Sequence, residues 1–161
     1  MHQDAFYILP EDKASAEARI VELEQEIRAM GPDFYEALNQ SSETWHDNAP
    51  FDALREKQSG FVAELESLLQ VLHRASVFQP SEQDMVQIGS FVTLRDEQSA
   101  VQRYHIAGNW TPDAGKKRQG YITISCQTPV AQLLLGKQVG DQVRLGQKQK
   151  TYQVTNLTLK A

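Results

Sequence analysis

The stretch that decides the fold runs from Glu43 to Phe61 and reads E-T-W-H-D-N-A-P-F-D-A-L-R-E-K-Q-S-G-F. It begins as a polar, acidic turn and passes at Pro50 into a long amphipathic helix, because proline suits the first helical position. Asp47 or Asn48 is a suitable cap close to that position. Apolar heptad patterns approach the turn from both sides. The sequence therefore predicts a helical hairpin that has this turn at its end.

The two helices of the predicted hairpin each carry one narrow apolar stripe. Before the turn, apolar residues recur at alternating steps of four and three, as in a coiled-coil seam: Ala16, Ile20, Leu23, Ile27, Met30, Phe34 and Ala37. After the turn, the same steps pass through Phe51, Leu54, Gln58, Phe61, Leu65, Leu68 and Leu72. Neither helix can bury its stripe alone, so the roughly ten-residue connection predicts antiparallel pairing. Gly31-Pro32 is expected to kink or split the first helix.

Beyond a short polar linker at Gln79 to Glu82, the apolar period changes to that of β-strands. Strands are expected around Val86 to Leu94, with an interruption at Gly89, and around Val101 to Ile106, Tyr121 to Ile124, Val143 to Leu145 and Tyr152 to Leu159, with a polar loop at 108–120. Thr128-Pro129 supplies a cap and a first-turn proline for a short helix that Gly136 closes. The predicted class is α+β, with a helical hairpin over residues 1–78 and a small sheet domain over residues 79–161.

Composition places the chain among ordinary soluble proteins, with 161 residues, 40% hydrophobic and 23% charged. The single cysteine, Cys126, excludes an internal disulfide framework and is expected to be a small buried hydrophobe. No apolar run approaches the roughly 20 residues that span a bilayer, and the first residues lack the basic region of a signal peptide. These features predict a cytoplasmic protein.

The net charge of −5 is the sum of an acidic N-terminal part and a basic C-terminal part. Residues 1–76 hold 15 acidic against 6 basic residues, whereas residues 77–161 hold 6 against 10. An acidic arm argues against free DNA or a membrane as the partner of the arm, because both repel carboxylates. The arm is expected to prefer a basic surface or a metal ion. The cluster Lys116-Lys117-Arg118 is expected to be a solvated surface, with docking or nucleic-acid contact as the alternative.

Motifs for independent catalysis are absent from the sequence. It contains no Gly-rich phosphate loop, no H-E-x-x-H and no C-x-x-C, and its four histidines form no triad by spacing with Cys126. His46 beside Asp47 is a weak metal site, because two adjacent residues on a turn supply too few ligands. Chemistry at this turn is therefore expected to need groups from a partner. By itself the chain is therefore not predicted to be an enzyme.

Two separated motifs resemble the Gre family of bacterial transcription elongation factors. The first, N-A-P-F-D-A-L-R-E-K-Q-S-G-F from Asn48 to Phe61, is similar to the family's tip segment. The second, I-S-C-Q-T-P-V-A-Q-L-L-L-G-K-Q-V-G-D-Q-V from Ile124 to Val143, matches the family pattern I-S-x-x-S-P-I-A-x-x-L-x-G-K-x-x-G-D-x-V almost throughout. The resemblance covers the chain from about Lys13 to Leu159. It implies an N-terminal antiparallel coiled coil followed by a C-terminal domain of FKBP-like fold.

The resemblance also implies a mechanism. Gre factors dock the C-terminal domain at the rim of the RNA polymerase secondary channel, here through the corner Thr128-Pro129, and pass the coiled coil to the active centre. There, acidic tip residues help to hold an Mg²⁺ ion shared with the polymerase, which then hydrolyses backtracked RNA. Asp47 is the expected metal-contacting carboxylate and Glu43 the second catalytic carboxylate. No cofactor of its own is implied, and the RNA 3′ end and DNA are met only within the elongation complex.

The tip departs from the family's D-L-x-E-N-A, since this chain has T-W-H-D-N-A at the aligned positions 44–49. Thr44 replaces one carboxylate, and a neutral hydroxyl binds a hard cation more weakly. Thr44, Trp45 and His46 are expected contacts of the tip. The open alternative is a channel-binding regulator or inhibitor that does not stimulate cleavage. Prolyl isomerase activity is a third reading, suggested only by the FKBP-like fold, which does not itself confer activity.

Overall fold

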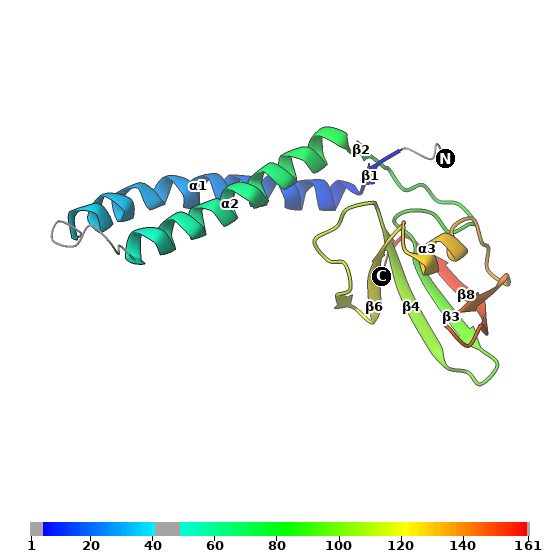
Figure 1. Ribbon diagram of the computed structural model, residues 1–161. Coiled ribbons are helices and arrows are strands. Elements are labelled where there is room, and N and C mark those ends of the chain that lie inside the picture. The colour runs from blue at the N-terminus through cyan, green and yellow to red at the C-terminus, as the bar shows by residue number, and fades with distance from the viewer. Residues whose placement is uncertain (1–4, 41–48, 161) are drawn as a thin grey trace. The chain divides into compact units, whose positions relative to one another are not determined.

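The computed structural model describes residues 5–40 and 49–160 of the chain (Figure 1). These residues divide into two compact units. Residues 14–74 form a helical unit, and the residues on either side of that range form a sheet-containing unit. The two units are described separately below. Together they give the predicted α+β class, with a helical hairpin followed by a sheet domain.

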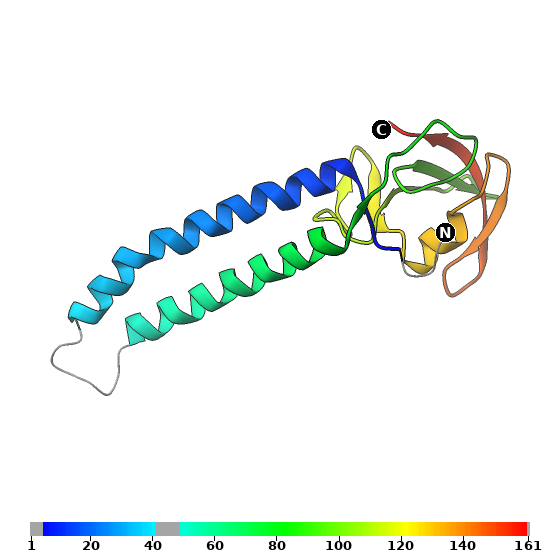
Figure 2. The same cartoon turned by 90° about the horizontal axis from the view of Figure 1, so that it is seen from above.

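The helical unit is an antiparallel hairpin of α1 (Pro10–Gln40) and α2 (Ala49–Arg74), which lie side by side in Figures 1 and 2. The predicted stripe of α1 is the least exposed part of that helix, with Leu23 fully buried and Met30 at 4% exposure. On α2, Leu68 is buried and the other stripe residues are partly buried. Most side chains of the two helices that lie outside the stripes are exposed. The predicted seam is therefore confirmed.

Gly31 and Pro32 do not split α1, contrary to one of the two predicted effects. The helix runs without interruption from Pro10 to Gln40 and contains Pro32. Both residues are exposed. A proline in a helix removes one backbone hydrogen bond, and on an exposed face the freed carbonyl can bond to water. Buried Met30 and Ala37 on either side keep the seam in register.

The sheet domain is built on a six-stranded sheet with the order β5-β6-β4-β3-β8-β7. Its strands are β3 (Phe91–Asp96), β4 (Val101–Ala107), β5 (Lys117–Arg118), β6 (Tyr121–Ser125), β7 (Gln142–Leu145) and β8 (Lys150–Thr158). Neighbouring strands are antiparallel except β4 and β6, which are parallel. A bulge in the pairing of β3 with β8 follows Thr93. This small mixed sheet matches the predicted architecture.

Two details of the predicted strands are wrong. Val86 and Ile88 are buried, but they precede β3 and do not belong to it. The predicted interruption at Gly89 is present, because this residue adopts a left-handed φ of +92°. Only glycine takes this conformation at little cost. The loop predicted at 108–120 is also interrupted, because Lys117–Arg118 pair with β6 as a short edge strand.

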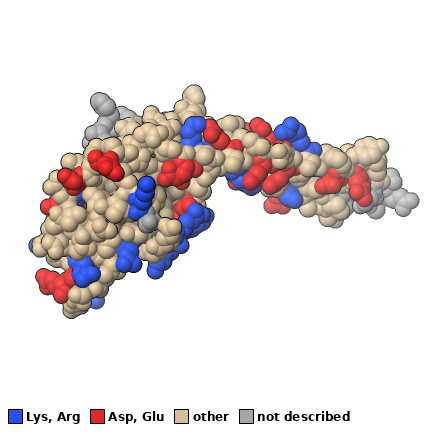
Figure 3. Space-filling model, turned by 180° about the vertical axis from the view of Figure 1, so that it is seen from behind, with Lys and Arg blue, Asp and Glu red and all other residues tan. Residues whose placement is uncertain are grey.

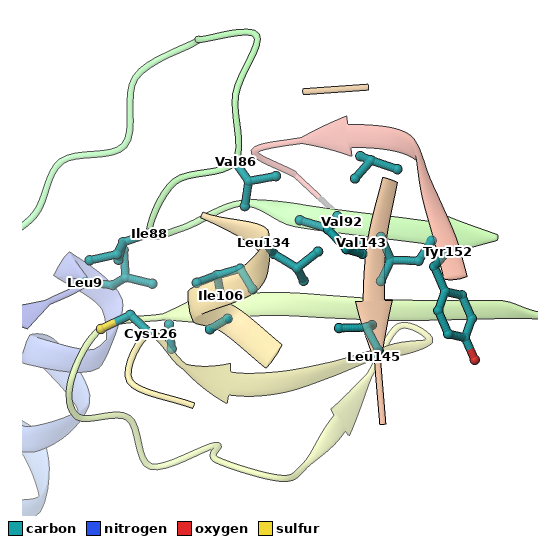
Figure 4. Close-up of a cluster of buried hydrophobic side chains, with 14 residues drawn as sticks. Leu9, Val86, Ile88, Val92, Ile106, Cys126, Leu134, Val143, Leu145 and Tyr152 are labelled. Atoms are coloured by element: carbon teal, nitrogen blue, oxygen red, sulfur yellow. The ribbon is translucent and has the colours of Figure 1, made fainter. Parts of the chain in front are cut away.

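One face of the sheet carries the core of the domain. Fourteen buried residues form a single cluster (Figure 4). It includes Val92, Ile106 and Val154 from the central strands and Leu134 from α3 (Pro129–Leu134), which packs on this face. Cys126 joins the cluster at 6% exposure, so the prediction of a small buried hydrophobe is confirmed. Burial also raises the pKa of its thiol.

The first described residues belong to the sheet domain. β1 (Tyr7–Ile8) pairs in parallel with β2 (Ser76–Val77), the backbone amide of Tyr7 donates to Asn109 Oδ1 at 2.7 Å, and Leu9 lies in the core. The structural division therefore differs from a single cut after residue 78, since the chain leaves this domain after Lys13 and returns to it at Ala75. Contacts between residues about a hundred positions apart leave no local pattern in the sequence.

Candidate functional sites

The end of the helical hairpin is the first candidate site. Phe34 of α1 and Phe51 of α2 meet there edge to face, with ring centroids 5.5 Å apart. The predicted tip residues lie between Gln40 and Ala49 and outside the described residues: Glu43, Thr44, Trp45, His46 and Asp47. Their roles stay predictions. The aromatic contact holds the two helix ends that carry this segment.

An ion cluster joins the two helices further along the hairpin. Arg19 Nε donates to Glu64 Oε1 at 2.8 Å, and Nη2 donates to Oε2 at 3.0 Å. Arg19 Nη1 also donates to Glu22 at 3.2 Å and to Glu26 at 3.3 Å. The guanidinium holds the pKa of Glu64 below its usual value. Such forked pairing adds geometric specificity, so it fixes which turn of α1 faces which turn of α2. The heptad pattern alone did not predict this pair.

The corner at Thr128-Pro129 is the second candidate site. Thr128 Oγ1 donates to the Ser125 carbonyl at 2.9 Å and accepts from the Ala131 amide at 3.3 Å. It therefore caps α3, as predicted. Gln132 Nε2 donates to the Cys126 carbonyl and closes the same turn from the other side. The corner is thus a rigid structure in which the backbone of both flanks is hydrogen-bonded.

The rigid corner presents apolar groups to solvent. Pro129 is exposed, Leu133 in the same helix is 48% exposed, and Val139 after the helix is 57% exposed. Single exposed apolar residues are common, but a rigid helix that presents several of them suits a contact with another protein. Leu133 was not singled out from the sequence, and its neighbour Leu134 lies fully buried in the core.

A cavity of about 310 Å³ in the sheet domain is the third candidate site. Its lining includes Glu11 and Asp12 from the first turn of α1 and Asp113 from the loop before β5. Asp12 is only 6% exposed; its Oδ1 accepts from Thr111 Oγ1 at 3.1 Å. Its Oδ2 is buried and has no hydrogen-bond partner among the described residues. Burial raises the pKa of Asp12 to about 6, although the hydrogen bond from Thr111 acts to lower it.

Aromatic side chains form another wall of this cavity. His105 stacks on Phe91 with centroids 4.2 Å apart, and Tyr121 meets Phe91 edge to face at 5.1 Å. Burial lowers the pKa of His105, which favours the neutral imidazole at neutral pH. Asp113 pairs with Arg118 at 3.0 Å and with Lys116 at 3.2 Å. This cavity was not identified from the sequence, because Asp12 and its partner Thr111 lie 99 positions apart.

Groups that could hold a metal ion by themselves are not found in the part of the chain that the structure describes. No three His, Cys, Asp or Glu side chains gather there in a suitable arrangement. Among the same residues, no helix combines the length and the apolar character that crossing a membrane requires. The possible metal contact at His46 and Asp47 lies outside the described residues.

Comparison with known proteins points to one family. Residues 80–159 match the family model described as "Transcription elongation factor, GreA/GreB, C-term". The chain is 35% identical over 116 residues to transcription elongation factor GreA of Sulfurovum sp., covering 69% of this chain and 68% of that protein. It is 33% identical over 102 residues to GreA of Rickettsia bellii, covering 62% of this chain and 60% of the relative. The chain thus matches less than two thirds of the Rickettsia protein's length.

Among solved structures, the chain is similar to GreA factor homolog 1 (Gfh1) of Thermus thermophilus. The superposition has a TM-score of 0.43 and 18% identity, and it covers 96% of this chain and 99% of the Thermus chain. The family relationship rests on the sequence matches and not on this superposition.

Replacing Asp12 by asparagine is expected to change how stability depends on pH. The pKa of about 6 in the folded state lies above the ordinary value of 3.8, so folding binds a proton between these values. The stability of the unchanged protein should therefore fall as the pH rises from about 4 to about 6 and then level off. Asparagine keeps the acceptor for Thr111 and cannot ionise. Asp12→Asn should gain about 1 to 2 kcal/mol relative to the unchanged protein above the folded pKa, less than the full shift implies because the asparagine amide is itself a buried polar group with incomplete hydrogen bonding.

The measurement is the free energy of unfolding from urea titrations at a series of pH values. Asp33→Asn is the control, since Asp33 is exposed on the same helix. A difference between Asp12→Asn and the unchanged protein that stays constant across this pH range would contradict the role assigned to burial.

Proposed function

Because this chain belongs to the GreA/GreB family of transcription elongation factors, we propose that it binds bacterial RNA polymerase and stimulates hydrolysis of backtracked RNA. The observation that carries the proposal is the hairpin, whose connecting segment contains the carboxylates Glu43 and Asp47. The 26 residues of α2 extend about 39 Å at 1.5 Å per residue. A paired-helix arm of this length can enter a channel that a globular domain cannot.

The proposed chemistry belongs to the polymerase, and the tip supplies carboxylate oxygens. Mg²⁺ prefers such hard oxygen ligands and is often bound by only one or two protein carboxylates. Asp47 is proposed to contact the shared ion and Glu43 to assist, while Thr44, Trp45 and His46 contact the surroundings of the active centre. A bound Mg²⁺ would stabilise the charge that develops on the phosphate during hydrolysis.

Docking is proposed to use the corner at Thr128-Pro129. Its hydrogen bonds make it rigid, so it can bind without a large loss of conformational freedom. Exposed Pro129 and Leu133 supply the apolar contact. In this scheme the sheet domain provides affinity for the polymerase, and the arm provides chemistry. The two roles can be separated by substitution.

Substitution of Asp47 tests the chemistry. With stalled elongation complexes whose RNA is backtracked, the unchanged protein should accelerate release of the RNA 3′ fragment. Asp47→Asn should slow this by about tenfold or more, as expected when an interaction made at the reacting centre is lost, while affinity for the polymerase is retained. Asp33→Asn removes the same charge from an exposed position on α1 and serves as the matched control. Equal cleavage by the Asp47 variant and the unchanged protein would remove Asp47 from the mechanism.

Substitution of Pro129 tests docking. Glutamate is tolerated in the first turn of a helix, so Pro129→Glu should preserve the fold while placing a charge in the apolar contact. Affinity for core RNA polymerase without nucleic acid should fall by about tenfold or more, since a buried unpaired charge costs several kcal/mol. Gln153→Glu adds the same charge to an exposed position on β8 and should bind normally. If the two variants bind alike, docking lies elsewhere on the molecule.

A further inference from the structure

The six-stranded sheet has a second face, which α3 and the core do not cover. Side chains alternate between the two faces of a strand. On β3, Val92 and Leu94 point into the core, so Phe91, Thr93 and Arg95 belong to the opposite face. The pairing of the strands assigns the remaining positions in the same way. We call this surface the open face.

All four arginines of residues 77–161 lie on the open face. They come from four different strands, namely Arg118 on β5, Arg103 on β4, Arg95 on β3 and Arg144 on β7. In register, Arg103 lies opposite Thr93, Arg95 lies opposite Gln153, and Gln153 lies opposite Gln142, two residues before Arg144. With strands about 4.8 Å apart and about 3.3 Å per residue, successive arginines are about 8 to 12 Å apart at their backbones.

Acidic side chains are missing from the open face of these described strands. The one carboxylate in the six strands is Asp96, and it points to the other face, where it is buried beside Lys150. The remaining open-face positions are mainly uncharged polar residues, including Thr93, Gln142, Thr151, Gln153 and Asn156. The described strands therefore carry basic and no acidic side chains on this face, although the protein as a whole carries a charge of −5 and Glu11, Asp12 and Asp113 border the face beside Arg118.

Most of these arginines are available for a ligand. All four are exposed. Among the described residues, Arg118 is the one of these four arginines that forms an ion pair, and its partner is Asp113. Figure 3 shows Lys and Arg side chains spread over the sheet domain on the side that Figure 1 hides. Arg95, Arg103 and Arg144 are consequently the groups that can bind an anion.

We propose that the open face binds the phosphodiester backbone of a nucleic-acid strand. The planar guanidinium group donates two parallel hydrogen bonds to a phosphate, which lysine cannot do. Lysines occur elsewhere in the domain, whereas arginine is confined to this face. Flat sheets that combine basic and aromatic side chains are used to bind single strands. Tyr121 supplies an aromatic side chain on β6, between the strands that carry Arg118 and Arg103.

The chemistry of the face favours phosphate over the carboxylates of a partner protein. Protein interfaces need apolar or aromatic anchors at their centre. The aromatic side chains of this face, Phe91, His105 and Tyr121, pack on one another beside the acidic border. The area around Arg103, Arg95 and Arg144 offers uncharged polar groups, and the exposed apolar residue of the face, Val101, stands at a strand end. The acidic residues Glu11, Asp12 and Asp113 border the face where Phe91, His105, Tyr121 and Arg118 lie. A strand is therefore expected to cross Arg103, Arg95 and Arg144, away from that border.

The test measures binding of the whole protein to labelled oligonucleotides by fluorescence anisotropy, without polymerase. Single-stranded RNA, single-stranded DNA and duplex DNA of equal length are compared at several salt concentrations. Removing two phosphate contacts in Arg95→Gln/Arg103→Gln should weaken binding by about tenfold at low salt and reduce the salt slope by about 1.4. The control, Arg28→Gln/Arg55→Gln, makes the same change in charge at exposed positions of the hairpin and should bind like the unchanged protein.

The outcomes decide the proposal. A loss confined to the sheet variant supports it, and the order of the three oligonucleotides identifies the strand type that this face prefers. Equal binding by the sheet variant and the control would overturn it. So would displacement of the oligonucleotide by polyglutamate of equal charge at equal concentration, because the face would then be a general site for acidic chains. Circular dichroism checks that both variants are folded. Since polymerase is absent, failure here leaves the proposed elongation function untouched.

Discussion

The pairing of two helices that each have a single apolar stripe is the constraint on which this structure depends. Neither α1 nor α2 buries enough surface to be stable alone in water, so each helix covers the apolar stripe of the other. The contacts of Arg19 with Glu64 and of Phe34 with Phe51 fix the antiparallel register at two levels. The paired helices therefore form a stiff arm. In the proposed function, this stiffness allows the short connecting segment to reach the catalytic centre of the polymerase.

The segments before and after the hairpin in the sequence both contribute to the sheet domain. Leu9 enters the core, and β1 pairs with β2 directly after α2. The buried, incompletely paired Asp12 is a cost of this closure, because a carboxylate in a low-dielectric site resists ionisation. The domain consequently combines a well-packed core and a capped corner at Thr128-Pro129 with a polar cavity that holds a buried carboxylate. It also has an open face whose charge is opposite to that of the arm.

Features set by neighbouring residues could be predicted from the sequence, and features set by distant ones could not. The heptad stripes and the Thr128 cap follow from local periodicity and capping chemistry, and the structure contains both. The interruption at Gly89 was likewise indicated by the sequence, whereas the bond from Thr111 to Asp12 joins residues 99 positions apart and was not. The roles of the tip residues remain predictions from the sequence, because residues 41–48 lie outside the described part of the chain.

The central claim is that the end of the hairpin reaches the catalytic centre of the polymerase. It is tested most directly with an iron chelate attached to Asp47→Cys in a Cys126→Ser background, which leaves one thiol in the chain. In a complex with RNA polymerase, radicals from the iron should cut the polymerase chains beside their catalytic metal ligands. Cuts confined to the outer surface of a polymerase that still binds the protein would contradict the account.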